Sequence, residues 1–138
     1  MVRVVLDSNE YVFYIMGLSD VVEFILNAGA EVCVHTAIIE EVWRNLMAPA
    51  HKTAFLSILL SPDVRIYTDK LPRALREEYA RLGLRGGDIL IAAFTEFCHA
   101  DILVTEDTNF GVLKGRPMSH SRYCPIGSSG ARACRQRG

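Results

Sequence analysis

The chain has 138 residues, of which 50% are hydrophobic and 22% charged, and its formal net charge is −1. This length fits one domain that buries roughly two thirds of the surface of its unfolded chain without a disulfide or a structural metal. The sequence is too polar along its length for a membrane span. Its start, MVRVVLDSNE, reaches Asp7 without an apolar stretch long enough for a signal peptide. We therefore expect a cytoplasmic protein that has no contact with a membrane.

The net charge is unevenly distributed along the chain. Nine basic and all sixteen acidic residues lie at or before Asp107, which gives that part a net charge of −7, whereas residues 108–138 hold six basic and no acidic residues. The basic end could supply phosphate contacts, or it could be a solvated tail. Residues 126–138 show no apolar periodicity. We therefore expect a single domain over 1–125, followed by a tail that is disordered or foreign to the fold.

Short apolar runs alternate with helical stretches along the chain. The pattern predicts, in chain order, a strand over 2–6, a helix over 21–29, a strand over 31–35, helices over 36–47 and 54–60, a strand over 64–67, helices over 72–83 and 87–100, and a strand over 102–105. Thr36 is the expected N-cap of the helix that begins there. Repeated strand-to-helix connections are right-handed and put helices on both faces of a parallel sheet. We therefore expect a three-layer α/β/α fold with a mainly parallel central sheet.

The cysteines and histidines have no spacing typical of a metal or redox site. The four cysteines lie far apart without a CxxC pair, and the four histidines share no spacing that would bring them to one ion. Cys33 and Cys98 are expected to pack as small apolar groups. The sequence therefore predicts neither a zinc site nor a thiol redox motif.

Acidic residues recur at the predicted transitions from strand to helix. Asp7 follows the first strand and Asp107 the last one, so both lie at the carboxyl ends of parallel strands, where open α/β sheets bind ligands. Asp88 lies in the first turn of a predicted helix, and Glu40 and Glu41 lie in the first two turns of another. Carboxylates from these distant segments could converge at one edge of the sheet.

Converging carboxylates repel one another and raise one another's pKa unless a cation neutralises them. Oxygen ligands without histidine or cysteine suit Mg²⁺ or Mn²⁺. Such ions polarise a phosphoryl oxygen, lower the pKa of an attacking water and stabilise the leaving oxygen of a phosphodiester. The acidic positions therefore predict one or two such ions and a phosphate-containing substrate.

Four sequence motifs, in order, resemble those of the PIN-domain nuclease family. VVLDSNEYV is similar to the family's first motif, an Asp followed by Ser or Thr and then Asn, and TAIIEEVWRNL to the second, a Glu on the helix after the second strand. GGDILIAAFTEFCHADILVTEDTNF resembles the third and fourth together, an Asp that opens an alanine-containing helix and a Thr-x-Asp after the next strand. The resemblance runs from residue 2 to about residue 115.

The resemblance implies a metal-dependent ribonuclease with an RNA substrate. Four acids would hold Mg²⁺ or Mn²⁺ and carry catalysis: Asp7, Glu41, Asp88 and Asp107. Asn9 and Thr105 would support them by hydrogen bonds to carboxylates or bound water. Small single-domain members of the VapC type are toxins of toxin-antitoxin pairs, so the resemblance also implies a cognate antitoxin protein. A homodimer is expected by resemblance and because residues 11–17, YVFYIMG, are rich in large apolar side chains.

Several alternatives remain open at this point. Family members often carry a second Asp two residues after the Thr-x-Asp acid, where this chain has Asn109, and this leaves Asp107, with or without Glu106, to serve a second metal. Asp7 could merely cap a helix, and Asp88 could be a favourable first-turn charge. The alternative function is a PIN-like module that binds RNA or a protein partner and whose metal site is impaired.

Glu40 and Glu41 are neighbours, as are Glu106 and Asp107, and in each pair one acid is favoured for the site. Glu41 is favoured over Glu40 because an apolar residue follows it, as in the family's motif. Thr105 and Asp107 share one side of an extended strand, so we expect Asp107 to face the site, oriented by Thr105, and Glu106 to face solvent. The sequence does not specify the target RNA, the cleavage position or the antitoxin.

Overall fold

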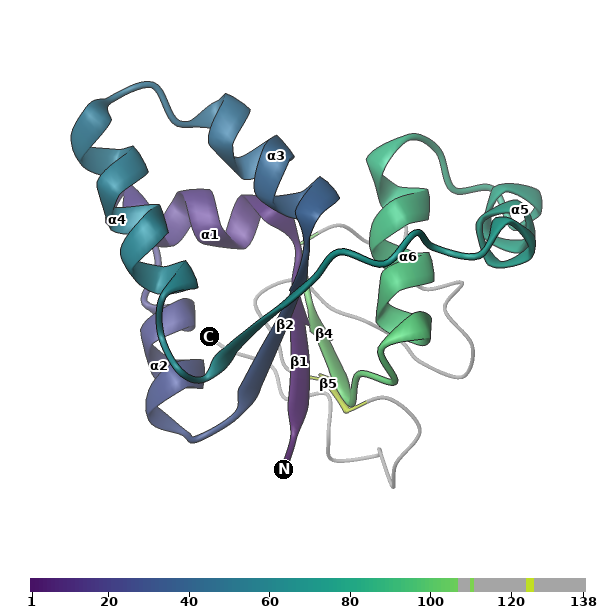
Figure 1. The fold of residues 1–138 in the computed structure, drawn as a ribbon, viewed down its shortest axis with the longest axis horizontal. Coiled ribbons are helices and arrows are strands. Elements are labelled where there is room, and N and C mark those ends of the chain that lie inside the picture. The colour runs from purple at the N-terminus through teal and green to yellow at the C-terminus, as the bar shows by residue number, and fades with distance from the viewer. Residues whose placement is uncertain (107–109, 111–123, 126–138) are drawn as a thin grey trace.

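The computed structural model describes residues 1–106, 110 and 124–125, and these residues form a five-stranded sheet (Figure 1). Its strands are β1 (Arg3–Leu6), β2 (Glu31–His35), β3 (Val64–Tyr67), β4 (Ile102–Val104) and β5 (Cys124–Pro125). The order is β3-β2-β1-β4-β5, in which the first four strands are parallel and β5 is antiparallel to β4. The expected mainly parallel sheet is confirmed.

Helices cover both faces of this sheet. They are α1 (Ser8–Ile15), α2 (Val21–Asn27), α3 (Thr36–Asn45), α4 (Pro49–Leu59), α5 (Arg73–Arg81) and α6 (Gly87–Phe97). Figure 1 views the sheet from its edge, with α1, α2 and α4 on one side and α5 and α6 on the other. The three-layer α/β/α arrangement expected from the sequence is therefore present. Within the described ranges, every helix is too short or too polar to cross a membrane.

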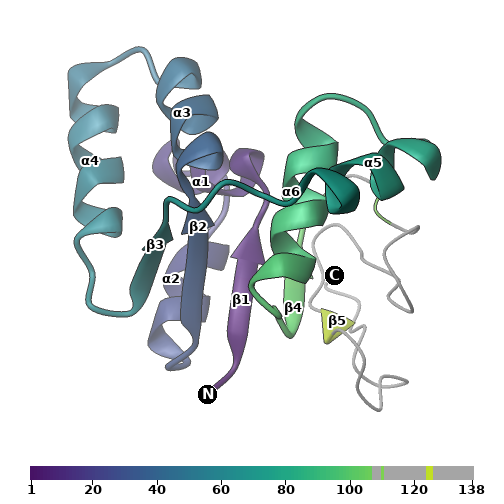
Figure 2. The ribbon, with the colours of Figure 1, turned by 45° about the vertical axis from the view of Figure 1, so that its right-hand side comes forward.

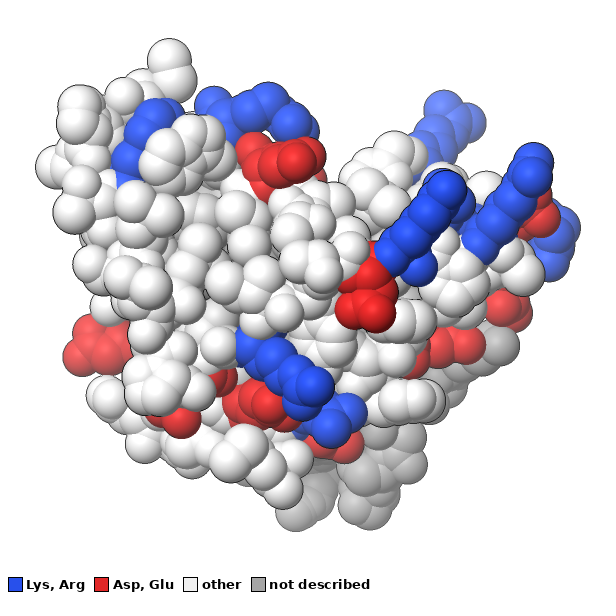
Figure 3. All heavy atoms as spheres, in the orientation of Figure 1, with Lys and Arg blue, Asp and Glu red and all other residues white. Residues whose placement is uncertain are grey.

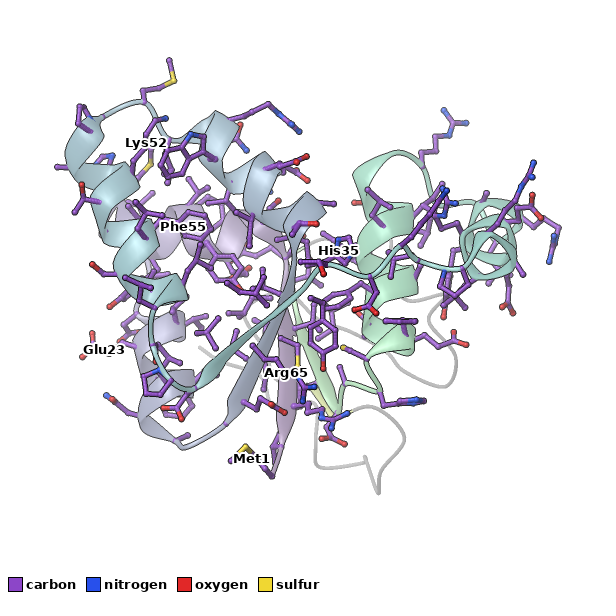
Figure 4. All side chains as sticks on the ribbon, viewed as in Figure 1. Met1, Glu23, His35, Lys52, Phe55 and Arg65 are labelled. Atoms are coloured by element: carbon purple, nitrogen blue, oxygen red, sulfur yellow. The ribbon has the colours of Figure 1, made fainter. Side chains whose placement is uncertain are left out.

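Apolar side chains fill both interfaces between the sheet and its helices. Val5 of the central strand β1 is buried because helices cover both faces of the sheet. On one face, Tyr11 packs edge-on against Phe55 of α4, with their ring centroids 5.7 Å apart (Figure 4). On the other face, the small side chains of Ala92 and Ala93 are fully buried and allow α6 to lie close to the strands.

α1 and β5 are absent from the predicted elements, and helix ends account for the other main differences. α4 begins at Pro49, earlier than predicted, because proline suits the first turn of a helix, where its missing N–H is not needed. The N-cap of α3 is His35, so the predicted Thr36 cap is wrong. The Nδ1 atom of His35 accepts a hydrogen bond from the Ala37 N–H at 3.1 Å, which leaves Nε2 to donate to the Asp69 carbonyl at 2.7 Å (Figure 4). Both ring nitrogens are therefore engaged in shaping this turn.

The central strand β1 lies where the chain reverses its direction across the sheet. From β1 the chain steps to β2 and β3 on one side, and it later returns to β4 on the other side (Figure 2). In open α/β sheets, ligands bind at the carboxyl edge beside such a reversal. The residues that directly follow β1 and β4 are therefore the first place to look for a site.

Candidate functional site

Asp7 is held between the two strands that flank the reversal. It directly follows β1, is 7% exposed, and its backbone N–H donates to the Val104 carbonyl of β4 at 3.0 Å. Its Oδ2 atom accepts a hydrogen bond from the Thr105 hydroxyl at 2.8 Å, and its Oδ1 lies 3.4 Å from the donor Oγ of Ser8. Asp7 occupies the N-cap position of α1, yet its side chain makes no capping hydrogen bond. The carboxylate therefore contacts the end of β4 rather than the amides of its own helix.

Glu41 lies against the start of α6. A Cβ atom added at Gly87 would stand 3.2 Å from Glu41 Oε1, so a side chain at this glycine would crowd the carboxyl group. Asp88 is the next residue and lies in the first turn of α6. Glu41 is partly buried whereas Glu40 is exposed. Of the two neighbouring acids, Glu41 is thus the one that lies against the start of α6.

The paired glycines before Asp88 have different physical roles. Gly86 has a φ of 54° and ψ of −129°, a conformation that an L-residue rarely adopts, and it is the N-cap of α6. Gly87 leaves the space into which the Glu41 carboxyl extends. The paired glycines therefore produce both the turn and the close approach of Glu41 to the start of α6.

Glu10 is a buried acid that the sequence analysis did not single out. It lies in the first turn of α1, is 2% exposed, and its Oε2 atom has no hydrogen-bond partner among the described residues. Burial raises its pKa to about 7, and the negative charges of Glu106 and Asp7 add to the rise. A signal was present in the sequence, because an acid three residues after Asp7 falls on the same turn of a helix that begins at Ser8.

The remaining predicted residues are placed only in part. Asn9 is exposed on α1, and Glu106 is exposed after β4, as expected of a solvent-facing charge. Asp107 and Asn109 lie outside the described residues, as does the predicted tail over 126–138. In the described part of the chain, no group of three or more acidic, histidine or cysteine side chains is close enough to hold a metal ion.

The side chains at this edge still suit a hard divalent cation. They offer oxygen atoms alone, which is the donor set that Mg²⁺ and Mn²⁺ prefer. Glu10 Oε2 is buried and unpartnered within the described ranges, and burying a carboxylate without a partner or a cation is unfavourable. Asp7 directly precedes α1, Glu41 lies on α3 and Asp88 lies on α6, and these three helices begin at the same end of the sheet (Figures 1 and 2).

A groove of about 460 Å³ lies between α5 and the first turn of α6. Gly86 and Ile89, from the segment that contains Asp88, line it together with Arg73 and Arg76 of α5. The Nε atom of Arg76 is buried and has no hydrogen-bond partner in the part of the chain that is described. Figure 3 shows basic side chains gathered over the end of the molecule that α5 forms. Glu77 also lines the groove and pairs with Arg73 at 3.0 Å, so the lining holds charges of both signs.

Comparison with solved structures supports the fold. The chain is similar to a chain in the crystal structure of VapBC2 from Rickettsia felis bound to a DNA fragment from their promoter, with a TM-score of 0.61 and 20% sequence identity. The alignment covers 88% of this chain and 98% of the other. No protein-family model matches the sequence, and no curated protein matches it. The likeness confirms a three-layer α/β/α, PIN-like fold.

Proposed function

We propose that the protein is a metal-dependent ribonuclease that hydrolyses RNA phosphodiester bonds and acts as the toxin of a toxin-antitoxin pair. The observation that carries this proposal is the 2.8 Å hydrogen bond from Thr105 to Asp7, which holds a buried carboxylate at the reversal of the sheet. A carboxylate that only capped α1 would bond to the amides of that helix, and this one does not. The position is the one where open α/β sheets place their ligands.

The proposed metal-site and catalytic acids come from four separate segments. Asp7 follows β1, Glu41 lies on α3, Asp88 opens α6, and Asp107 follows β4. Thr105 orients the Asp7 carboxylate through its hydroxyl. When one or two Mg²⁺ or Mn²⁺ ions are bound there, they supply electrophilic stabilisation of the phosphate and activation of water. The protein side chains would position the ions and exclude bulk water, so no side-chain nucleophile is required.

The groove beside Asp88 suits the substrate's phosphate backbone. Guanidinium groups bind phosphate oxygens through paired hydrogen bonds, and Arg73 and Arg76 line the groove, where Arg73 also pairs with Glu77. Ile89 adds apolar surface on which a nucleobase could rest. An RNA strand that lies in this groove would pass next to the acidic edge.

The proposal includes an antitoxin and a second copy of the chain as partners. The structural neighbour VapBC2 is a toxin-antitoxin complex, which supports an antitoxin partner for this chain. A basic side chain of such a partner could pair with the acids in place of the metal. In the segment 11–17, Tyr11 is buried in the core, whereas Met16 is 47% exposed and Leu18 beyond it 72%. These two exposed side chains are the proposed dimer contact, and a monomer at micromolar concentration by light scattering would contradict it.

One observation favours the alternative of a PIN-like binding module with an impaired metal site. The chain has Asn109 where an acid would assist a second ion, and an amide carries no charge. Titration calorimetry with Mn²⁺ separates the two functions. The ribonuclease requires binding that Asp7→Asn and Asp88→Asn abolish, whereas the module predicts no binding that depends on these acids.

The direct test is cleavage of a pool of structured RNAs by the purified protein in Mg²⁺ or Mn²⁺, and then in EDTA. The proposal predicts cleavage that needs the metal. Asp107→Asn should lower the rate by orders of magnitude because a ligand is lost, while Glu106→Gln should stay near wild type. A dead Glu106→Gln beside an active Asp107→Asn would overturn the assignment of these neighbours, and two active variants would overturn the four-acid site.

A further inference from the structure

Glu10 directly follows the Asp-Ser-Asn of the first motif and is not one of the positions that define it, yet it lies beside the proposed site. It is one helical turn from Asp7, and the negative charges of Asp7 and Glu106 both act on it. We propose that Glu10 is a fifth carboxyl group of the metal site, which supplies an oxygen and a negative charge to the divalent cation. This inference rests on the proposed function and deepens it.

The burial of Glu10 supports a role as a metal ligand. The residue is 2% exposed, and Oε2 lacks a hydrogen-bond partner among the described residues. Removing a carboxyl group from water without compensation destabilises a protein, because the lost hydration is not replaced. A glutamate that serves only the fold would be paired or would point to solvent. A site that receives a cation gives the buried oxygen the partner that it lacks.

The position of Glu10 in the first turn of α1 also supports this role. An acid at the third position of a helix often accepts a hydrogen bond from the backbone N–H of the N-cap residue. In α1 the N-cap is Asp7, and its N–H donates to the Val104 carbonyl of β4 at 3.0 Å instead. The backbone N–H to which an acid at the position of Glu10 would usually bond is therefore already paired with the neighbouring strand.

The negative charges of Asp7 and Glu10 also favour a bound cation. Asp7 is also buried, and two buried carboxylates one turn apart repel each other in a medium of low polarity. A divalent cation between the segments removes this repulsion. Glu10 would add one negative charge to those of the four proposed acids.

Binding of Mn²⁺ alone, measured by titration calorimetry at pH 8, tests the proposal in the intact chain. Glu10→Gln keeps the size of the side chain and should bind Mn²⁺ about 10- to 100-fold more weakly, or lose one bound equivalent, as changes around metal sites do. Glu10→Asp keeps the charge and should bind more tightly than Glu10→Gln. Glu40→Gln removes an exposed acid from α3 and is the matched control, for which wild-type affinity is expected. Far-UV circular dichroism checks that each variant is folded.

The rise in melting temperature that Mn²⁺ produces gives a second readout independent of activity, because a cation that binds only the folded state stabilises it. A smaller rise for Glu10→Gln than for Glu40→Gln supports the proposal. If Asp7→Asn abolishes Mn²⁺ binding while Glu10→Gln binds like wild type, Glu10 is not part of the site and the ribonuclease proposal stands. If the wild-type protein binds no Mn²⁺, both proposals fail.

Discussion

Replacing Glu10 by glutamine should stabilise the protein at alkaline pH in the absence of metal. Burial and the nearby charges of Asp7 and Glu106 raise the pKa of Glu10 from an ordinary value of 4.5 to about 7. A shift of this size corresponds to roughly 3 kcal/mol, since each pKa unit is worth about 1.4 kcal/mol. Glutamine has nearly the same volume but carries no charge, so the variant lacks the destabilisation that the ionised carboxyl group causes.

The sign of the effect depends on pH. The folded state holds the proton of Glu10 more tightly than the unfolded chain does, so the free energy of unfolding falls as pH rises from about 4.5 to 7. Below this window Glu10 is protonated in both states, and Glu10→Gln should change stability little. Above it the variant should be more stable than wild type by up to ~3 kcal/mol, which corresponds to a melting temperature about 10 °C higher for a domain of this size.

Urea unfolding in EDTA, followed by circular dichroism at several pH values between 4.5 and 8.5, measures this difference. EDTA is needed because a bound cation would offset the cost of the ionised carboxyl. Glu40→Gln serves as the control, because an exposed acid should give a difference from wild type that stays small across the range. The buried charge of Glu10 does not destabilise the protein if Glu10→Gln is less stable than wild type at pH 8. The same conclusion follows if its gain in free energy of unfolding is equal at every pH.

Three further substitutions test the geometry of the acidic edge. Thr105→Val removes the hydroxyl that donates to Asp7 and should lower the free energy of unfolding by about 1–3 kcal/mol, whereas Thr105→Ser should recover most of it. Gly87→Ala places a methyl group against the Glu41 carboxyl, so Mn²⁺ affinity by calorimetry should fall while the melting temperature without metal changes little. Asp88→Asn should preserve or raise the metal-free melting temperature and lose most of the Mn²⁺-induced rise; a large loss without metal would instead show a structural role.

The sheet and the order of its elements could be predicted from the sequence because their signals are local. The parallel strands are short apolar runs rich in β-branched residues, and α2 and α5 are followed by Gly29 and Gly83, whose positive φ angles suit the turn after a helix. The extent of α4 was less predictable, because its first turn, from Pro49, is polar and carries no apolar period. The cap formed by His35 depends on the Asp69 carbonyl, which is far along the chain and invisible to local patterns.

The position of Asp7 was predictable, but the packing around it was not. The Asp7 carboxylate at the end of β1 follows from strand geometry, whereas its contact with Thr105 depends on the pairing of β1 with β4. Glu10 was missed because α1 was not among the predicted helices, and an acid near the start of a helix is in any case normally a solvated charge. Only the tertiary packing around α1 shows that this one is buried, so burial rather than residue type identifies it.

The hydrogen bond between Thr105 and Asp7 joins residues 98 positions apart, and this separation sets when the site can form during synthesis. Domains fold as their chain emerges from the ribosome, and β1 can pair with β2 long before β4 has been made. Until then the second edge of β1 is open and the Asp7 carboxylate has neither the Val104 carbonyl nor the Thr105 hydroxyl to fix it. These contacts of Asp7 therefore form only after most of the chain has been synthesised. Pairing of β4 with β1 is the step that completes the acidic edge, and any activity there has to follow it.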